Sequence, residues 1–167
     1  MQDLLPGSGK NHKGQYLSFT LGSDDYAVDI LRVQEIRGWE DVRPLPDSKP
    51  YVKGVLDLRG TIVPIIDLRV RFGEQDAEYS ATTVVIVLSV DLGNDLFQLV
   101  GAVVDGVSDV LDIDHGDMKP PPEIGGAVSK RYLSGMVSLP RGMVIFLDLD
   151  HLFEPAELAG LSGPTEE

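Results

Sequence analysis

The sequence contains one strand–turn–strand segment twice, and this repeat limits the possible folds more than any other feature. The first copy runs from Gly54 to Gly73 and the second from Gly135 to Phe153. In both copies an apolar run, an Arg-Gly turn and a second apolar run lead to an Asp placed to cap a short helical turn. The second run is one residue shorter in the second copy when the Arg-Gly pairs are aligned. A segment that recurs with its motifs in the same order predicts two similar subdomains that arose by duplication.

The neighbouring segments extend the repeat over most of the chain. Tyr51 and Tyr132 stand ahead of the two copies, and the motif V-Q-E-I, which ends at Ile36, is matched by V-S-D-V, which ends at Val110. Each half also begins with two strand-like runs around a polar turn, at 15–30 and at 82–104. Short strands with frequent turn signals and little helix predict an all-β fold, in which five strands close a small barrel in each half.

This organisation predicts two five-stranded β-barrel subdomains side by side. They are expected at about 15–75 and 82–150, with approximate boundaries that allow strands to be exchanged between them. Residues 1–14 are polar and contain Gly and Pro, so we expect a disordered tail. The segment PAELAGL at 155–161 predicts a short C-terminal helix, because Pro is tolerated in a first helical turn, and 154–167 would hold this helix and a tail.

Charge and cysteine content exclude several classes of protein. The formal net charge is −13, from 14 Lys and Arg against 27 Asp and Glu. This excess of acid disfavours nucleic acids and anionic membrane surfaces, so we predict no nucleic-acid binding and no direct membrane contact. The chain has no Cys, which excludes disulfides, thiolate catalysis and thiolate metal sites. Because neither a signal-peptide pattern nor an apolar run of membrane-spanning length is visible, we expect a cytoplasmic protein.

Asp67 and Asp148 are equivalent in the repeat and allow two interpretations. Paired carboxylates of a duplicated chain could share a proton at a pseudo-twofold axis and act in an enzyme. Alternatively, each Asp ends a strand and caps a helical turn, and the lack of an Asp-Thr/Ser-Gly loop at both positions favours this interpretation. The 3 His residues are widely separated, and no zinc or phosphate-binding motif is present. We therefore expect no metal and no cofactor.

Four motifs, VQEIRGW, GVLDLRG, VPIIDLR and VVDGVSDVL, resemble the CheW family of bacterial chemotaxis coupling proteins, over a range from about Gln15 to Phe153. The resemblance implies two five-stranded SH3-like β-barrels and a scaffold without catalysis. It implies that the protein joins the cytoplasmic tips of methyl-accepting chemoreceptors to the histidine kinase CheA, is a monomer when free, and is recruited to membrane-associated receptor arrays. A CheW-like module of another kinase-linked signalling pathway is the alternative. Asp57 stands where the family often has Asn, and it keeps a short acceptor side chain.

The resemblance also implies roles for individual residues. Glu35 and Arg59 match a family pair that supports the receptor-facing surface, and an acid and an arginine could form a bidentate bridge that fixes the turn. Several valines match positions that line or support a groove for a receptor helix, although each could equally belong to the core. Gly54 and Gly101 are expected where a side chain would clash. The implied receptor-binding set is Val33, Glu35, Ile36, Gly54, Arg59, Val84, Gly101, Val107 and Val110, and the implied kinase or ring contact is Lys119 and Ile124.

Overall fold

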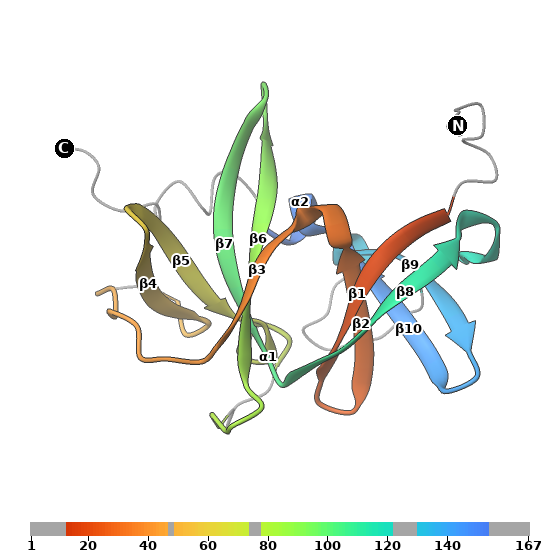
Figure 1. Ribbon diagram of the computed structural model, residues 1–167, viewed down its shortest axis with the longest axis horizontal. Helices are drawn as coiled ribbons and strands as arrows, with labels where there is room; N and C mark the ends of the chain where they lie inside the picture. The colour runs from red at the N-terminus through yellow and green to blue at the C-terminus, as the bar shows by residue number, and fades with distance from the viewer. Residues whose placement is uncertain (1–12, 47–48, 74–77, 122–129, 154–167) are drawn as a thin grey trace.

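The computed structural model describes residues 13–46, 49–73, 78–121 and 130–153. Within these residues the chain forms two five-stranded curled sheets with short helical turns between strands (Figure 1), which confirms the predicted all-β fold class. The strands are β1 (Lys13–Leu21), β2 (Asp24–Asp29), β3 (Val33–Gly38), β4 (Val52–Leu58), β5 (Thr61–Asp67), β6 (Val84–Gly93), β7 (Leu96–Val104), β8 (Gly106–Asp114), β9 (Leu133–Leu139) and β10 (Gly142–Leu147). The helical turns are η2 (Ile30–Arg32), α1 (Leu68–Arg71), η3 (His115–Asp117), η4 (Lys130–Tyr132) and α2 (Leu149–Leu152).

The ends of the chain bear on two of the predictions. Strand β1 begins at Lys13, so the last two positions of the predicted tail, 13 and 14, already belong to the folded region. The remainder of that tail and the helix predicted at 155–161 lie outside the described residues.

Each barrel combines strands from both halves of the chain. One sheet has the order β8-β1-β2-β10-β9, and the other has the order β3-β6-β7-β5-β4. We call them the β1 barrel and the β3 barrel. The hairpin at the start of each half pairs with two strands of the other half and shares a sheet with three, so the boundaries at about 15–75 and 82–150 do not coincide with the barrels. The prediction allowed strands to be exchanged between the subdomains, and the two sheets show this exchange.

Backbone hydrogen bonds repeat in the two barrels. The N–H of Asp67 donates to the carbonyl of Tyr51 at 2.8 Å, and the N–H of Asp148 donates to the carbonyl of Tyr132 at 2.8 Å. The parallel pairing of β5 with β7 is likewise matched by the parallel pairing of β10 with β2. The two copies of the repeat therefore have the same backbone architecture, as the sequence predicted.

The strand ladders align the two copies without a gap. Leu58 pairs with Thr61 across the first turn, and Leu139 pairs with Gly142 across the second. The turn Arg59-Gly60 therefore corresponds to 140–141, and the predicted one-residue deletion is wrong. It arose because the arginine occupies the first position of one turn and the second position of the other.

The motifs V-Q-E-I and V-S-D-V also occupy equivalent places. The β3–β6 ladder shifts register between Val33 and Glu35, and the β1–β8 ladder shifts between Leu17 and Phe19, which face the second motif. Both motifs thus form an edge strand with a β-bulge at the same point. A bulge bends the strand and re-aims its side chains, and here it does so identically in the two barrels.

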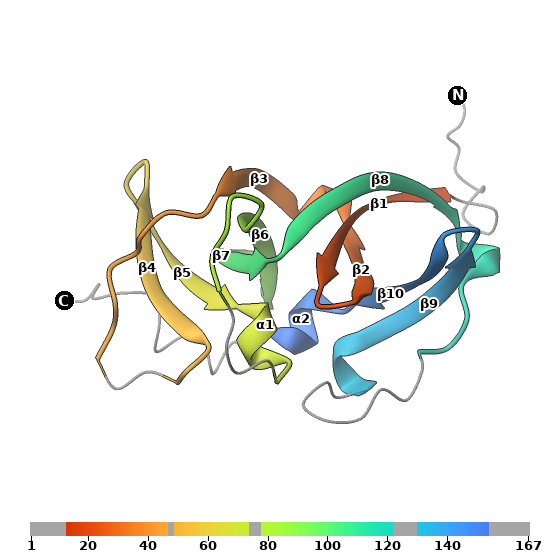
Figure 2. The same ribbon diagram turned by 90° about the horizontal axis from the view of Figure 1, so that it is seen from below.

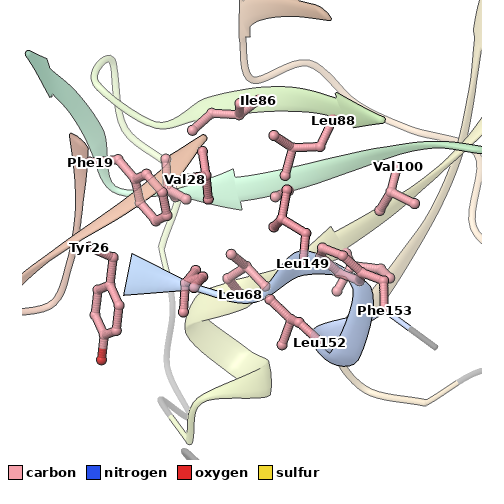
Figure 3. Close-up of a cluster of buried hydrophobic side chains, with 14 of the residues drawn as sticks. Phe19, Tyr26, Val28, Leu68, Ile86, Leu88, Val100, Leu149, Leu152 and Phe153 are labelled. Carbon is pink, nitrogen blue, oxygen red and sulfur yellow. The ribbon is translucent and has the colours of Figure 1, made fainter. Parts of the chain in front are cut away.

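A shared hydrophobic core lies between the barrels and holds them together (Figure 3). Alternate residues of β1 and β6 enter this core, as the two-residue period of a strand requires. The helical turns α1 and α2 close it from one side. Its labelled members in Figure 3 are Phe19, Tyr26, Val28, Leu68, Ile86, Leu88, Val100, Leu149, Leu152 and Phe153.

Candidate partner-binding surface

Three exposed apolar side chains lie on the edge strands β3 and β8. Ile36 is 45% exposed, Val107 36% and Val110 52%. Both strands run along the same face of the molecule, at the top of Figure 2. The ladders pair Ile36 with Ile86, Val107 with Phe19, and Val110 with Leu17, and all three partners are buried in the shared core.

Paired residues of neighbouring strands point to the same face of a sheet, so these three side chains lie on the same sheet faces as the shared core. They stay exposed because β3 and β8 are edge strands at its margin. Val33 and Val84 are partly buried and pack against the same core. We call these five residues the β3–β8 surface. The sequence allowed each of these valines to belong either to the core or to the surface. Val107 and Val110 lie at the surface, whereas Val33 and Val84 are partly buried and contribute to both.

The two predicted glycines are buried and have structural reasons to lack a side chain. A Cβ at Gly101 would lie 2.5 Å from Cδ1 of Ile65 and 2.9 Å from Cγ1 of Val85. Gly54 has a φ of +147°, and a Cβ there would overlap the backbone oxygen of Arg43. The expectation that a side chain would clash at both positions is confirmed. Their buried position means that they shape the strands rather than the surface itself.

Glu35 and Arg59 form an ion pair that joins the β3 edge of the barrel to the β4–β5 turn. Nη2 of Arg59 donates to Oε1 of Glu35 at 3.0 Å, so the predicted pairing is confirmed. The predicted bidentate geometry is wrong, because Oε2 of Glu35 accepts from Arg37 at 3.1 Å instead. Hydrogen bonding by Arg59, with the charges of Arg59 and Arg37, lowers the pKa of the Glu35 carboxyl below its usual value.

The turn that carries Arg59 is held in a conformation that the sequence favours. Arg59 and Gly60 both have positive φ, at 51° and 90°, as two-residue hairpin turns require. Oδ1 of Asp57 accepts from the N–H of Gly60 at 2.9 Å, so the acid at this position provides the expected acceptor. The side chain of Arg59 is 75% exposed, which leaves it accessible beside the β3–β8 surface.

A second ion pair with the same arrangement joins β8 to the β9–β10 turn of the other barrel. Nη1 of Arg141 donates to Oδ2 of Asp109 at 3.1 Å. Asp109 corresponds to Glu35 in the bulged edge strand, and Arg141 lies in the turn that corresponds to the turn of Arg59. The sequence prediction missed this pair, although aligning V-Q-E-I with V-S-D-V and the two Arg-Gly turns contained the signal for it.

Asp67 and Asp148 both cap helical turns, which confirms the capping interpretation. The oxygens of Asp67 accept from Nε and Nη2 of Arg69 at 2.9 and 2.8 Å, from the N–H of Arg69 at 3.0 Å, and from the hydroxyl of Tyr79 at 3.3 Å. These four bonds use the acceptor capacity of the carboxylate, so it has none left for a proton shared with Asp148. Burial, with the charge of Asp67, raises the pKa of the Tyr79 hydroxyl.

Arg32 and Asp150 form a bidentate ion pair that connects three elements. Nη1 and Nη2 of Arg32, in η2, donate to Oδ1 and Oδ2 of Asp150, in α2, at 3.0 and 2.7 Å. Nη1 of Arg32 also donates to the carbonyl of Ser89, and the N–H of Asp91 donates to Asp150, so β6 is held as well. Hydrogen bonding by Arg32 lowers the pKa of the Asp150 carboxyl. The sequence prediction missed this link because its members are far apart in the chain.

The predicted kinase or ring contact is covered only in part by the structure. Lys119 is exposed, and its backbone pairs with that of Met136 through two hydrogen bonds of 2.9 and 3.0 Å. Ile124 lies outside the described residues. The assignment of these two residues stays a prediction.

Two features are absent from the part of the chain that the structure describes. No group of three or more His, Cys, Asp or Glu in it is placed to hold a metal ion. Nor does it contain a helix of the length and apolar character needed to cross a membrane.

The strand-exchanged barrels and their exposed apolar edge define the class, a double-barrel module with a surface suited to binding another protein. The CheW-like domain family matches residues 15–157 of the chain. Chemotaxis protein CheW of Klebsiella aerogenes is 43% identical over 152 residues, covering 91% of this chain and 89% of that protein. Chemotaxis protein CheW of Treponema pallidum is 31% identical over 158 residues, covering 95% and 92%.

A solved structure gives the same answer for the fold. The crystal structure of the scaffolding protein TtCheW from Thermoanaerobacter tengcongensis matches with a TM-score of 0.76 and 29% identity, covering 86% of this chain and 94% of that chain. The chain belongs to the CheW-like domain family.

Proposed function

We propose that this protein is a non-catalytic chemotaxis adaptor that couples methyl-accepting chemoreceptors to the histidine kinase CheA. In this role it acts as a monomer in the cytoplasm and is recruited to membrane-associated receptor arrays. Membership of the CheW-like domain family supports the proposal, as do relatives named chemotaxis protein CheW and a structural neighbour described as a scaffolding protein.

The β3–β8 surface is the observation that carries the proposal. Its apolar side chains face the shared core but are left uncovered at the core's open edges. An amphipathic helix that lays its apolar face along the two edge strands would cover them, which is the helix-in-groove mode of recognition. A chemoreceptor tip offers such a helix. Receptor binding is therefore assigned to Val33, Glu35, Ile36, Arg59, Val84, Val107 and Val110, with Gly54 and Gly101 shaping the strands below.

The mechanism requires no chemistry by the protein itself. One rigid body that binds a receptor and the kinase together raises the effective concentration of each contact for the other, so that two weak contacts become strong in an array. The shared core makes the two barrels one body, so a displacement at the receptor-facing surface is passed to the kinase contact. That contact is proposed at Lys119 and Ile124.

Co-sedimentation tests the proposal. Purified protein is mixed with receptor-containing membranes, with and without CheA from the same organism, and with membranes that lack receptors as the control. The protein is expected in the pellet only when receptors are present, and CheA is expected to follow it there. If the protein pellets with neither partner, the proposed function is wrong and only the fold and family remain.

A further inference from the structure

The second ion pair holds more of its edge strand than the first one does. Besides contacting Asp109, Arg141 donates from Nη2 to Oγ of Ser18 at 3.1 Å. Oγ of the buried Ser18 donates to the carbonyl of Asp109 at 3.2 Å and accepts from its N–H at 3.1 Å. These contacts lie at the β-bulge, where the β1–β8 ladder loses its regular pairing. Side-chain bonds thus replace the missing ladder bonds at this point.

The position of the ion pair relates it to the exposed apolar residue beside it. Asp109 directly precedes Val110, as Glu35 directly precedes Ile36. Successive residues of a strand point to opposite faces. An arginine that fixes the acid on one face therefore fixes the direction of the apolar side chain on the other face.

We propose that Arg141, through Asp109 and Ser18, is a positioning residue for the β8 half of the receptor-facing surface. It sets the orientation of Val110 in the way that Arg59 sets that of Ile36. The two arginines occupy different positions in their two-residue turns: Arg59 is the first residue of its turn and Arg141 the second. The statement about receptors rests on the proposed function, whereas the statement about β8 concerns the isolated protein.

Amide hydrogen exchange of the isolated protein tests the structural part. In R141A the exchange of the Asp109 amide and its neighbours in β8 is expected to rise by about fivefold or more, with β3 unchanged, because local opening of an edge strand becomes easier. In R59A the exchange of the Glu35 amide and its neighbours in β3 is expected to rise, with β8 unchanged. R131A, which removes another exposed arginine of the β1 barrel, is the matched control and leaves both strands unchanged. Equal β8 exchange in R141A and R131A overturns the inference, whatever the receptor result is.

Binding measurements test the functional part. R141A is expected to weaken binding of a soluble receptor-tip fragment by about threefold to tenfold, while CheA binding changes by less than about twofold. R141K keeps the charge beside Asp109 and is expected to recover most of the affinity. If R59A weakens receptor binding and R141A does not, the inference is overturned and the proposed function stands. If wild-type protein binds no receptor fragment, the proposed function fails, and the exchange data alone decide the role of Arg141 in β8.

Discussion

The β1 barrel and the β3 barrel share a backbone plan but use equivalent side-chain positions differently. Both have a bulged edge strand, an arginine-bearing turn, and an Asp that caps a helical turn. They differ two residues after the cap, where Arg69 in the β3 barrel is buried and Asp150 in the β1 barrel is partly exposed. Arg69 binds both its own cap and Asp105, which lies between β7 and β8, whereas Asp150 binds Arg32 of η2. The two halves of the repeat therefore keep the same backbone hydrogen bonds, while the side chains at equivalent positions differ.

The hairpins that cross between the barrels differ as well. From Ser18 to its partner Ala27 the β1–β2 hairpin spans 27 − 18 = 9 positions, and from Val87 to its partner Gly101 the β6–β7 hairpin spans 101 − 87 = 14 positions. The longer hairpin extends beyond the barrels in Figure 1. The ion pair between Arg32 and Asp150 contacts it at Ser89 and Asp91. The shorter hairpin is contacted in a similar way by Asp105, which pairs with Arg69 at 3.3 Å and accepts from the N–H of Gly22 at 2.7 Å. Each hairpin is thus held by an ion pair that uses the residue two positions after a helix cap, Arg69 or Asp150, and the longer hairpin has no additional support of this kind among the described residues.

Among the comparisons between equivalent positions, the largest difference in unfolding free energy is expected between variants of the two helix caps. R69M would leave Asp67 buried without its ion-pair partner, and should lower the free energy of unfolding by about 3–5 kcal/mol. H151A removes an exposed partner of the equivalent Asp148, at 2.7 Å, and should cost less than about 1 kcal/mol. Urea unfolding of both variants measures the contrast. Similar losses in the two variants would mean that the caps are energetically equivalent despite their different burial.

The next largest difference is expected between equivalent glycines. G54A forces a Cβ against a backbone oxygen at a positive φ and should cost about 3 kcal/mol. In G135A the nearest atoms belong to the side chain of Met118, at 2.8 Å, and to the carbonyl of Lys119, at 2.9 Å. The methionine can move but the carbonyl of Lys119 has to shift with its segment of backbone, and Gly135 has no positive φ, so we expect a loss of about 2 kcal/mol, smaller than that of G54A. Thermal unfolding compares them, and a larger loss in G135A would contradict this account of the two strands.

A smaller effect separates the equivalent valines of the edge strands. V107M enlarges an exposed side chain of the β3–β8 surface, and should weaken receptor binding several-fold with unfolding free energy within about 0.5 kcal/mol of wild type. V33M enlarges a residue packed against the shared core, and should cost about 1 kcal/mol through overpacking. Receptor and CheA pull-downs with both variants, together with urea unfolding, check this. Unchanged receptor binding by V107M would remove Val107 from the proposed surface.

The smallest effect is the pH dependence of the first ion pair. Because the folded protein lowers the pKa of Glu35, the stabilisation by this carboxylate is present above its unfolded pKa and is lost as pH falls through the folded pKa. Carboxyl-carbon NMR titration should give a midpoint below the usual glutamate value, and R59A should raise it. R141A leaves the midpoint of Glu35 unchanged if the two ion pairs act separately. A midpoint that R59A does not move would show that Arg59 does not hold Glu35.

The sequence predicted those features of the molecule that depend on neighbouring residues. The strand–turn–strand repeat and the capping role of Asp67 follow from turn residues, periodicity and repetition, all of which can be read along the chain, whereas the clash at Gly101 was expected from the family resemblance. The exchange of strands could not be decided, because either hairpin could pair within its own half. The pairing depends on long-range contacts that leave no local signal.

The side-chain network at the surface was predictable in part. Glu35 and Arg59 were expected to meet, but the competing donor Arg37 comes from the same strand and prevents the bidentate geometry. Arg32 and Asp150 stand 118 positions apart, and only the folded arrangement of η2 and α2 joins them. The resemblance to the CheW family suggested which residues face a partner, whereas the folded structure was needed to identify which of their side chains are exposed.

The most direct test of the central claim is the affinity of the double variant I36S/V110S for a receptor-tip fragment, measured beside its affinity for CheA. Met143 is also an exposed apolar residue, at 43%, but lies on β10, so M143S is the matched control. The account predicts that the double variant binds the receptor fragment at least about tenfold more weakly, keeps its affinity for CheA, and that M143S keeps both. Receptor affinity equal to that of wild type in I36S/V110S would contradict the claim that the β3–β8 surface is where the receptor binds.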